Sequence, residues 1–244
     1  MSNNRVIWLN EGDPPECFPP VSSALREPDG LLAAGGDLTA ERLLYAYQHG
    51  IFPWYEEGQP LLWWSPDPRC VFLPGQFHIS RRLQRALRHS TAEIRVNTAF
   101  HEVILACAGP RKSEQGTWIT TAMIAAYEDL HEKSWAHSIE IWQSGELVGG
   151  LYGLCIGRVF FGESMFSKVS NASKLALLYI ANLLNSGTLE LLDCQVASSH
   201  LLGLGAKMMP RSEFVAHLDV AGNPATRYEN WPDAPLACSL LSCD

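Results

Sequence analysis

Apolar positions along this chain change their spacing several times, and each change predicts a different kind of element. A spacing of three and four residues is typical of helices that bury one face, and alternation of every second residue is typical of strands. Helices are predicted over residues 37–50 and 120–133, with a buried helix that is apolar nearly all round over 172–185. Strands are predicted over residues 138–142, 147–154, 158–165 and 189–196, and shorter helices near Ser199 and Ser212.

The order helix, three strands, helix, strand and helix predicts the α/β (α+β) class with a mixed sheet. This order resembles the plan of the acetyltransferase-like, GNAT-type N-acyltransferase fold. The segment before residue 70 does not belong to that plan and ends in a stretch rich in proline and aromatic residues. We therefore expect a small N-terminal domain over residues 1–69 and a GNAT-like acyltransferase domain over residues 70–244.

Composition indicates an ordinary globular protein, with 47% hydrophobic and 18% charged residues. The N-terminus has no apolar leader segment, and the longest uncharged apolar run, 147–157, is too short to cross a bilayer. Seven scattered cysteines without a Cys-x-x-Cys pair argue against both a disulfide framework and a zinc site. We expect a soluble protein of the reducing cytoplasm that holds no metal and contacts no membrane.

Basic residues cluster in one short segment although the net charge is -8. Of 18 basic residues, five lie between positions 81 and 95, namely Arg81, Arg82, Arg85, Arg88 and Arg95. A helix capped by Ser80 would place most of these arginines on one face and two leucines on the other. The stripe has two open interpretations, a solvated helix face or a surface that binds phosphate groups.

Aromatic residues are dense just before the predicted boundary, where Trp54, Trp63 and Trp64 fall within eleven positions. Such clusters are more often small cores than ligand platforms. Because three tryptophans lie so close together, a surface on which a ligand stacks remains an alternative interpretation.

Three polar side chains, Glu163, Asp193 and Gln195, fall on predicted core strands. A buried polar group is costly unless it has a partner, so each needs either a structural partner or a function. Asp193 and Gln195 are two positions apart, so on a strand they would project from one face. For the two acids, the structural alternatives are a hydrogen-bonded pair or a partnership with an arginine.

The turn before the long buried helix, residues 167–172, contains no glycine. Acetyltransferases of the fold bind the pyrophosphate of CoA on a glycine-rich turn at this place, where backbone N–H groups face the anion. A CoA donor is therefore disfavoured. An acyl donor with its own large anionic scaffold, such as aminoacyl-tRNA, would give the basic helix a function.

Eight motifs follow one another in an order that closely resembles the leucyl/phenylalanyl-tRNA–protein transferase family, from about Leu25 to about Glu213. They are Gly35-Gly36-Asp37-Leu38, His49-Gly50-Ile51-Phe52-Pro53-Trp54, Trp63-Trp64-Ser65-Pro66-Asp67-Pro68-Arg69, Gly116-Thr117-Trp118-Ile119-Thr120, His137-Ser138-Ile139-Glu140, Glu146-Leu147-Val148-Gly149-Gly150, Gly162-Glu163-Ser164-Met165-Phe166-Ser167 and Asp193-Cys194-Gln195.

The resemblance implies an enzyme that moves Leu or Phe, and Met less well, from its tRNA to the α-amino group of proteins beginning with Arg or Lys. The product would be marked for degradation through the N-degron pathway, without a metal or an organic cofactor. The reaction is aminolysis of an ester, so the enzyme has mainly to position the amine, remove its proton and stabilise an oxyanion.

The resemblance also implies residue roles. Asp193 and Gln195 would be catalytic, with the carboxylate polarising Gln195 so that its side-chain oxygen can accept a hydrogen bond from the attacking amine. Glu163 would hold the positive charge of the acceptor. The donor side chain would lie among Trp118, Leu151, Met165 and Leu177, its terminal adenosine would stack on Trp54 and Tyr47, and Arg81, Arg82, Arg85 and Arg88 would contact the tRNA backbone along the acceptor stem.

Other functions fit parts of the sequence. Gly162-Glu163-Ser164-Met165-Phe166 is a weak match to a serine hydrolase elbow, because Phe166 stands where the second glycine belongs. A non-catalytic tRNA-binding protein would need the arginines and tryptophans but neither Asp193 nor Gln195. A tRNA-dependent transferase that extends cell-wall precursors would need a site for a nucleotide-linked muropeptide, and no motif indicates one.

Overall fold

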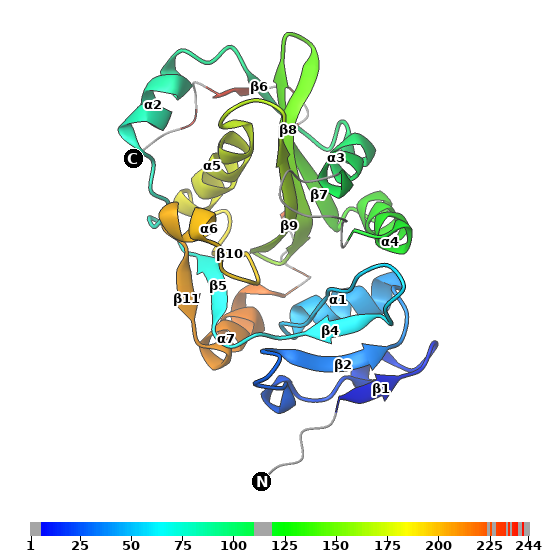
Figure 1. Cartoon of the computed structure of the whole chain (residues 1–244). Coiled ribbons are helices and arrows are strands. Elements are labelled where there is room, and N and C mark those ends of the chain that lie inside the picture. Colours follow the sequence, from blue (N-terminus) through cyan, green and yellow to red (C-terminus); the bar gives the residue numbers. More distant parts are fainter. Residues whose placement is uncertain are drawn as a thin grey trace.

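The computed structural model describes residues 6–109, 119–223, 225, 228–232, 234, 236–238 and 241, with Ala86 and Arg88 described by their backbone. Two β-sheets form the framework (Figure 1). Four short strands of the N-terminal region make the first sheet in the order β1-β2-β4-β3. These strands are β1 Ile7–Leu9, β2 Leu31–Gly35, β3 Phe52–Pro53 and β4 Leu62–Trp64, and helix α1, Ala40–Gln48, lies between β2 and β3 in the chain.

Eight strands form the second sheet in the order β11-β5-β10-β9-β8-β7-β6-β12. Its strands are β5 Arg69–Phe72, β6 Glu93–Val96, β7 Ala136–Gln143, β8 Glu146–Ile156, β9 Val159–Ser167, β10 Leu191–Asp193, β11 Lys207–Met209 and β12 Leu236–Ala237. All neighbouring pairs are antiparallel except β9 and β10, which are parallel, so the predicted mixed sheet is confirmed.

Helices cover both faces of the large sheet (Figure 1). Helix α3, Phe100–Ala108, and helix α4, Thr121–Glu132, pack on one face, where they share a hydrophobic core with α1 and the small sheet. Helix α5, Ala172–Asn185, packs on the other face together with α2, Arg81–Arg88. The remaining helices are α6 Ser199–Gly203 and α7 Arg211–Ala221.

The predicted elements agree with the structure in type and position, with one exception that matters for function. The strand expected over residues 189–196 ends at Asp193, so this prediction is wrong at its C-terminal end. The reason lies in the backbone, because Gln195 has a φ of 54° and leaves the extended conformation that a strand requires. Asp193 and Gln195 therefore do not lie on one strand.

The predicted domain boundary after residue 69 falls within β5, which begins at Arg69 and is the first strand of the large sheet along the chain. One hydrophobic core nevertheless runs from Leu9 in β1 to Ala221 in α7 and includes residues of both sheets. The division into domains 1–69 and 70–244 stays a prediction.

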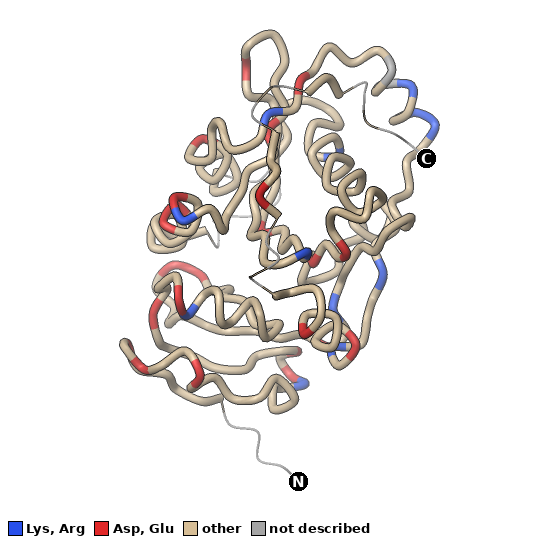
Figure 2. Tube along the Cα trace, turned by 180° about the vertical axis from the view of Figure 1, so that it is seen from behind, with Lys and Arg blue, Asp and Glu red and all other residues tan. Residues whose placement is uncertain are grey.

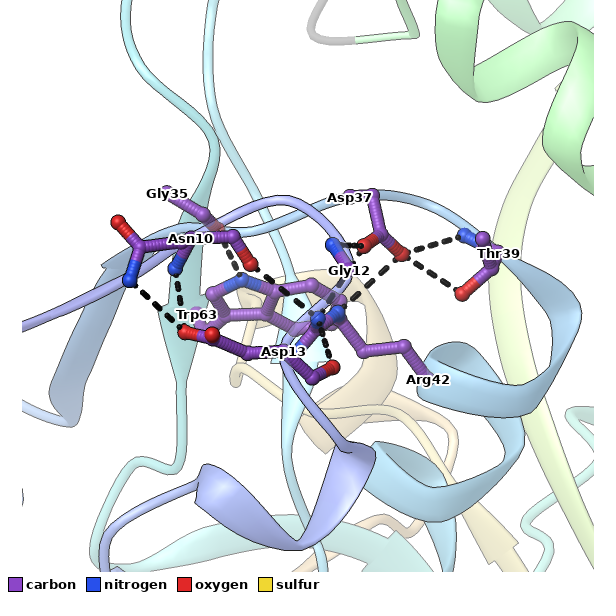
Figure 3. A network of polar contacts seen from close by, with 8 residues as sticks. All are labelled: Asn10, Gly12, Asp13, Gly35, Asp37, Thr39, Arg42 and Trp63. Carbon is purple, nitrogen blue, oxygen red and sulfur yellow. Dashed lines mark hydrogen bonds and ion pairs between the residues drawn. The ribbon is translucent and has the colours of Figure 1, made fainter.

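A polar network joins the N-terminal segment to the start of α1 (Figure 3). Arg42 is 1% exposed and donates two hydrogen bonds to Asp37, at 3.2 and 3.1 Å, and further bonds to the backbone oxygens of Asn10 and Asp13. Burial acts to raise the pKa of Asp37, but hydrogen bonds from Arg42 and Thr39 outweigh it and hold that pKa well below its ordinary value. The Gly-Gly-Asp-Leu motif thus secures α1.

Glu140 has a similar structural task at the start of α3. Its buried carboxylate accepts hydrogen bonds from the backbone of Thr98 and Ala99, from Ser138 and from Trp142. Negative charge at a helix N-terminus is favourable, and here it also satisfies free N–H groups. The motif His137-Ser138-Ile139-Glu140 is therefore accounted for by the fold.

No helix within the described part of the chain is long and apolar enough to cross a membrane.

Candidate active site

The candidate site lies where β9 and β10 separate. These strands pair in parallel only between Val159–Phe161 and Leu191–Asp193. Beyond that point the left-handed backbone of Gln195 turns the chain away from β9. Two adjoining cavities of about 330 and 110 Å³ occupy the resulting space, and both are lined by Glu163, Ser164, Met165, Cys194 and Gln195.

Asp193 is fully buried and paired with a buried arginine. Nε and Nη2 of Arg69 donate to its two carboxylate oxygens at 2.8 and 2.7 Å. Cζ of this guanidinium lies 4.7 Å from the ring centre of Phe52 and 4.7 Å from that of Phe214, and its Nη1 donates to the backbone oxygen of Gly50 at 3.0 Å. Of the two structural alternatives for Asp193, the arginine partner is the one observed.

Asp193 acts on Gln195 through the backbone. The backbone N–H of Gln195 donates to Asp193 Oδ1 at 2.9 Å, and this bond holds the residue in its left-handed conformation. The expectation that both side chains project from one strand face is wrong, because the strand has ended between them. Arg69 had no role in the sequence prediction, although a buried carboxylate is itself a signal that a cation is near.

Glu163 lies on β9 and is held by two phenols from different helices. Tyr47 of α1 donates to Oε1 at 2.6 Å, and Tyr127 of α4 donates to Oε2 at 2.9 Å. The side-chain Nε2 of Gln195 lies 3.5 Å from Oε1 on the side of the cavity. Burial raises the pKa of Glu163 to about 7, although the two phenol hydrogen bonds act to lower it.

The prediction that Tyr47 stacks on a base is wrong. Its ring is fully buried against Phe161, and its hydroxyl is bonded to Glu163. Tyr127 is also fully buried, and it falls in the helix predicted over residues 120–133, where the sequence prediction gave it no role in the site. A tyrosine rather than a phenylalanine at such a position is the available signal, since a buried hydroxyl needs a partner.

Trp54 is exposed at the larger cavity, as an aromatic ring that stacks on a ligand would have to be. Its side chain is 41% exposed, lines the larger cavity and is supported by Trp64, whose ring centre is 5.9 Å away. The indole N–H of Trp64 donates to the backbone oxygen of Trp54 at 2.7 Å and so fixes the edge of the cavity.

The smaller cavity is mainly apolar. The predicted residues Leu151, Met165 and Leu177 all line it, together with Leu192 and Leu201, which the sequence prediction did not include. Trp118, the fourth predicted residue of this pocket, lies outside the described residues.

The family model described as leucyl/phenylalanyl-tRNA protein transferase matches residues 71–219, and the model of its N-terminal domain matches residues 36–67. The chain belongs to this transferase family. It is a transferase, and its own structure is of the α/β class with an N-terminal region, as predicted.

Curated members of the family are similar over nearly their full length. The leucyl/phenylalanyl-tRNA–protein transferase of Stutzerimonas stutzeri is 54% identical over 88% of this chain and 96% of its own. That of Nitrosospira multiformis is 53% identical over 93% of this chain and 96% of its own.

Among solved structures, a GCN5-related N-acetyltransferase from Kribbella flavida covers 68% of this chain and 59% of its own, with 12% identity and a TM-score of 0.38. This likeness is too low to support an argument about fold or function.

The basic stripe of this transferase is formed as predicted in its described part. Leu83 N donates to the Ser80 hydroxyl at 3.2 Å, which caps α2, and Leu83 and Leu87 are buried. Arg81, Arg82 and Arg85 are exposed, and among the described residues none of them forms an ion pair. Figure 2 shows basic residues gathered along α2. The side chain of Arg88 lies outside the described part.

Across the ranges that the structure describes, no group of three or more His, Cys, Asp or Glu side chains is placed to hold a metal ion.

Proposed function

We propose that this transferase moves Leu or Phe, and Met less well, from aminoacyl-tRNA to the α-amino group of a protein that begins with Arg or Lys. The observation that carries the proposal is the convergence of Glu163 and Gln195 on a cavity whose deeper wall is apolar, in a chain of this family. Marking of the acceptor for N-degron degradation in the cytoplasm is part of the same proposal.

The donor side chain occupies the smaller cavity, beside Leu151, Leu177 and Met165. An apolar slot of this kind discriminates by only about 1 to 3 kcal/mol per methylene, so Leu, Phe and Met are accepted together. Trp54, exposed at the rim of the larger cavity, stacks on the terminal adenosine.

The acceptor enters beside Glu163, whose carboxylate binds the guanidinium or ammonium group of the first residue. Gln195 directs Nε2 toward Glu163, which leaves its Oε1 free to accept a hydrogen bond from the attacking amine. The neutral amine attacks the ester carbonyl carbon, the bond to the ribose oxygen breaks, and the proton that the amine nitrogen loses ends on that oxygen. Asp193 contributes by fixing the backbone of Gln195.

The start of α5 supports a donor other than CoA. Its first N–H groups already have acceptors within the chain, since Ser173 N donates to the Ser167 hydroxyl at 2.8 Å and Ala172 N to the Val169 oxygen at 3.3 Å. A pyrophosphate would have to displace these bonds, whereas acetyltransferases of this type need the groups free.

A transfer assay tests the proposal. Labelled Leu-tRNA and a protein beginning with Arg are incubated with the parent enzyme, with Gln195→Ala and with Gln143→Ala, an exposed glutamine at the end of β7. We expect label in the acceptor with the parent and Gln143→Ala, and a loss of at least roughly 100-fold with Gln195→Ala.

No label with the parent enzyme contradicts the proposed reaction, and full transfer by Gln195→Ala contradicts the proposed site. Binding of Leu-tRNA without any transfer would favour the non-catalytic tRNA-binding protein. A serine hydrolase is disfavoured by the course of β9, which continues through Ser164 to Ser167 without the sharp turn of a nucleophile elbow.

The role of α2 is tested by single charge reversals at Arg81, Arg82 and Arg85. Each is compared with Lys133→Glu, which makes the same charge change on the exposed end of α4. If the arginines contact tRNA phosphates, each reversal weakens tRNA binding and flattens its dependence on salt, and the control does neither. Equal effects of all four variants would identify α2 as a solvated face.

A further inference from the structure

Glu163, Tyr47 and Tyr127 form a closed ring of three oxygen contacts. Tyr47 contacts Glu163 Oε1, Tyr127 contacts Glu163 Oε2, and the two phenol oxygens contact each other. The three side chains come from α1, α4 and β9, so the ring forms only when these elements are packed together.

The number of protons decides which form of Glu163 fits this ring. Each phenol carries one proton and an ionised carboxylate carries none, so the ionised ring has two protons for three contacts. When Glu163 is ionised, both phenols donate to its carboxylate and the contact between the two phenol oxygens holds no hydrogen. A protonated carboxyl supplies the third proton: Glu163 then donates to one tyrosine, that tyrosine donates to the other, and the second tyrosine donates back to Glu163. Every oxygen contact then contains a hydrogen.

We propose that Glu163 is protonated in the free enzyme and that binding of a cationic acceptor N-terminus displaces this proton into solvent. The second part rests on the proposed function. The charge balance is simple: a neutral carboxyl and a solvated cation become a carboxylate–cation pair and one free proton. Tyr47 and Tyr127 are positioning residues in this scheme, because they decide when Glu163 carries a charge.

The groups around the ring place this switch near neutral pH. Burial raises the pKa of Glu163, the phenols of Tyr47 and Tyr127 lower it, the Asp193 charge raises it and the Arg69 charge lowers it, with a result of about 7. Tyr152 on β8 faces both tyrosines, and burial raises the pKa of Tyr47 and of Tyr127 well above 10, so the phenols stay neutral. Gln195, the remaining neighbour, does not titrate.

Titration of the free enzyme tests the first part without any substrate. Glutamate carboxyl carbons are labelled with ¹³C and followed by NMR, and Glu163→Gln assigns the signal. We expect one carboxyl with a midpoint near 7 that is absent from the variant, against about 4.3 for an ordinary glutamate. A Glu163 signal that titrates with the other glutamates overturns the proposal.

The titration midpoint of Glu163 in the variant Tyr127→Phe distinguishes a positioning role of this tyrosine from a merely structural one. The ionised carboxylate loses one of its two phenol donors, whereas the neutral carboxyl can turn its proton toward the cavity, so the midpoint should rise. A folded variant with an unchanged midpoint contradicts the positioning role. Tyr47→Phe gives the same test from the other side of the ring.

Calorimetry tests the second part. A short peptide of Arg followed by alanines is titrated at pH 6 into the parent enzyme and into Glu163→Gln, in two buffers with different enthalpies of ionisation. We expect the parent to release about one more proton per bound peptide than the variant, because the variant has no carboxyl proton to lose. Binding with equal proton release overturns the coupling. Failure of the peptide to bind the parent at any pH contradicts the proposed acceptor site instead, while the NMR titration still decides the state of the ring.

Discussion

Asp193 ends β10 and Glu163 lies midway along the neighbouring strand β9, yet their surroundings give them opposite properties. Asp193 has both oxygens bonded to Arg69, so its charge is balanced within the protein. Among the described residues, the hydrogen-bond partners of Glu163 are all neutral, namely Tyr47, Tyr127 and Gln195, and Glu163 faces the cavities. The hydrogen-bond partner of a buried acidic side chain, and not its burial alone, therefore determines what that side chain can do. Asp193 holds geometry, and Glu163 is left to respond to a ligand.

The largest effect should come from breaking the Asp193 pair. Asp193→Ala leaves the Arg69 charge buried without a partner, which typically costs about 3 to 5 kcal/mol of unfolding free energy. Urea denaturation measures this cost. The double variant Arg69→Met with Asp193→Leu removes both charges and should recover much of that stability without restoring transfer, since Gln195 loses the bond that fixes its backbone. Equal instability of the single and double variants would contradict the explanation that the unpaired Arg69 charge causes the loss.

Removing the charge of Glu163 should affect binding rather than folding. Glu163→Gln keeps the size of the side chain but loses a charge-assisted bond to the acceptor, worth about 1.5 to 3 kcal/mol, so KM for the acceptor should rise roughly 10- to 150-fold. KM for the aminoacyl-tRNA should stay near that of the parent. Steady-state kinetics with each substrate varied in turn checks this, and an equal rise in both KM values would contradict separate roles.

Substitutions at Trp54 and Tyr47 test which of the two rings contributes to binding of the donor. Trp54→Ala removes the exposed ring proposed to stack on adenosine and should weaken aminoacyl-tRNA binding by about 1 to 3 kcal/mol. Tyr47→Phe keeps its buried ring, so it should leave that affinity unchanged. Filter binding with Leu-tRNA measures both. A loss with Tyr47→Phe as large as with Trp54→Ala would mean that the Glu163 ring also supports the donor.

The smallest effect should appear in the pH dependence of stability. The folded pKa of Glu163 is about 7, above the value of 4.5 for an unperturbed side chain, so the folded state holds this proton more tightly. Stability from this group is therefore present in full at low pH and is lost as pH rises from about 4.5 through 7. The loss should be on the order of 1 to 2 kcal/mol, because the residue is partly exposed to the cavity.

Thermal unfolding between pH 4 and 8 measures this loss. Glu163→Gln cannot titrate and should lack this loss. The melting temperatures of the parent and the variant, plotted against pH, should therefore diverge as the pH rises. Parallel pH profiles would show that folding leaves the pKa of Glu163 unchanged.

The predicted helices and the three central strands agree with the structure because long apolar patterns report directly on which face is buried. The predicted slot residues Leu151, Met165 and Leu177 share a cavity for the same reason. The prediction failed where residues far apart in the chain meet. Packing brings together two such pairs, Arg69 with Asp193 and Tyr47 with Glu163. Local spacing in the sequence predicts neither pair.

Local spacing and the chemistry of single side chains are enough to predict the α/β order of elements, the basic helix with its Ser80 cap and the polar residues that need partners. Which partner each of these residues has depends on the tertiary structure. It ended β10 at Asp193, turned Gln195 toward the cavity, buried Tyr47 and gave Glu163 two phenols in place of a cation. The physical reason is that the charge state of a buried group depends on the donors and charges that long-range packing sets beside it.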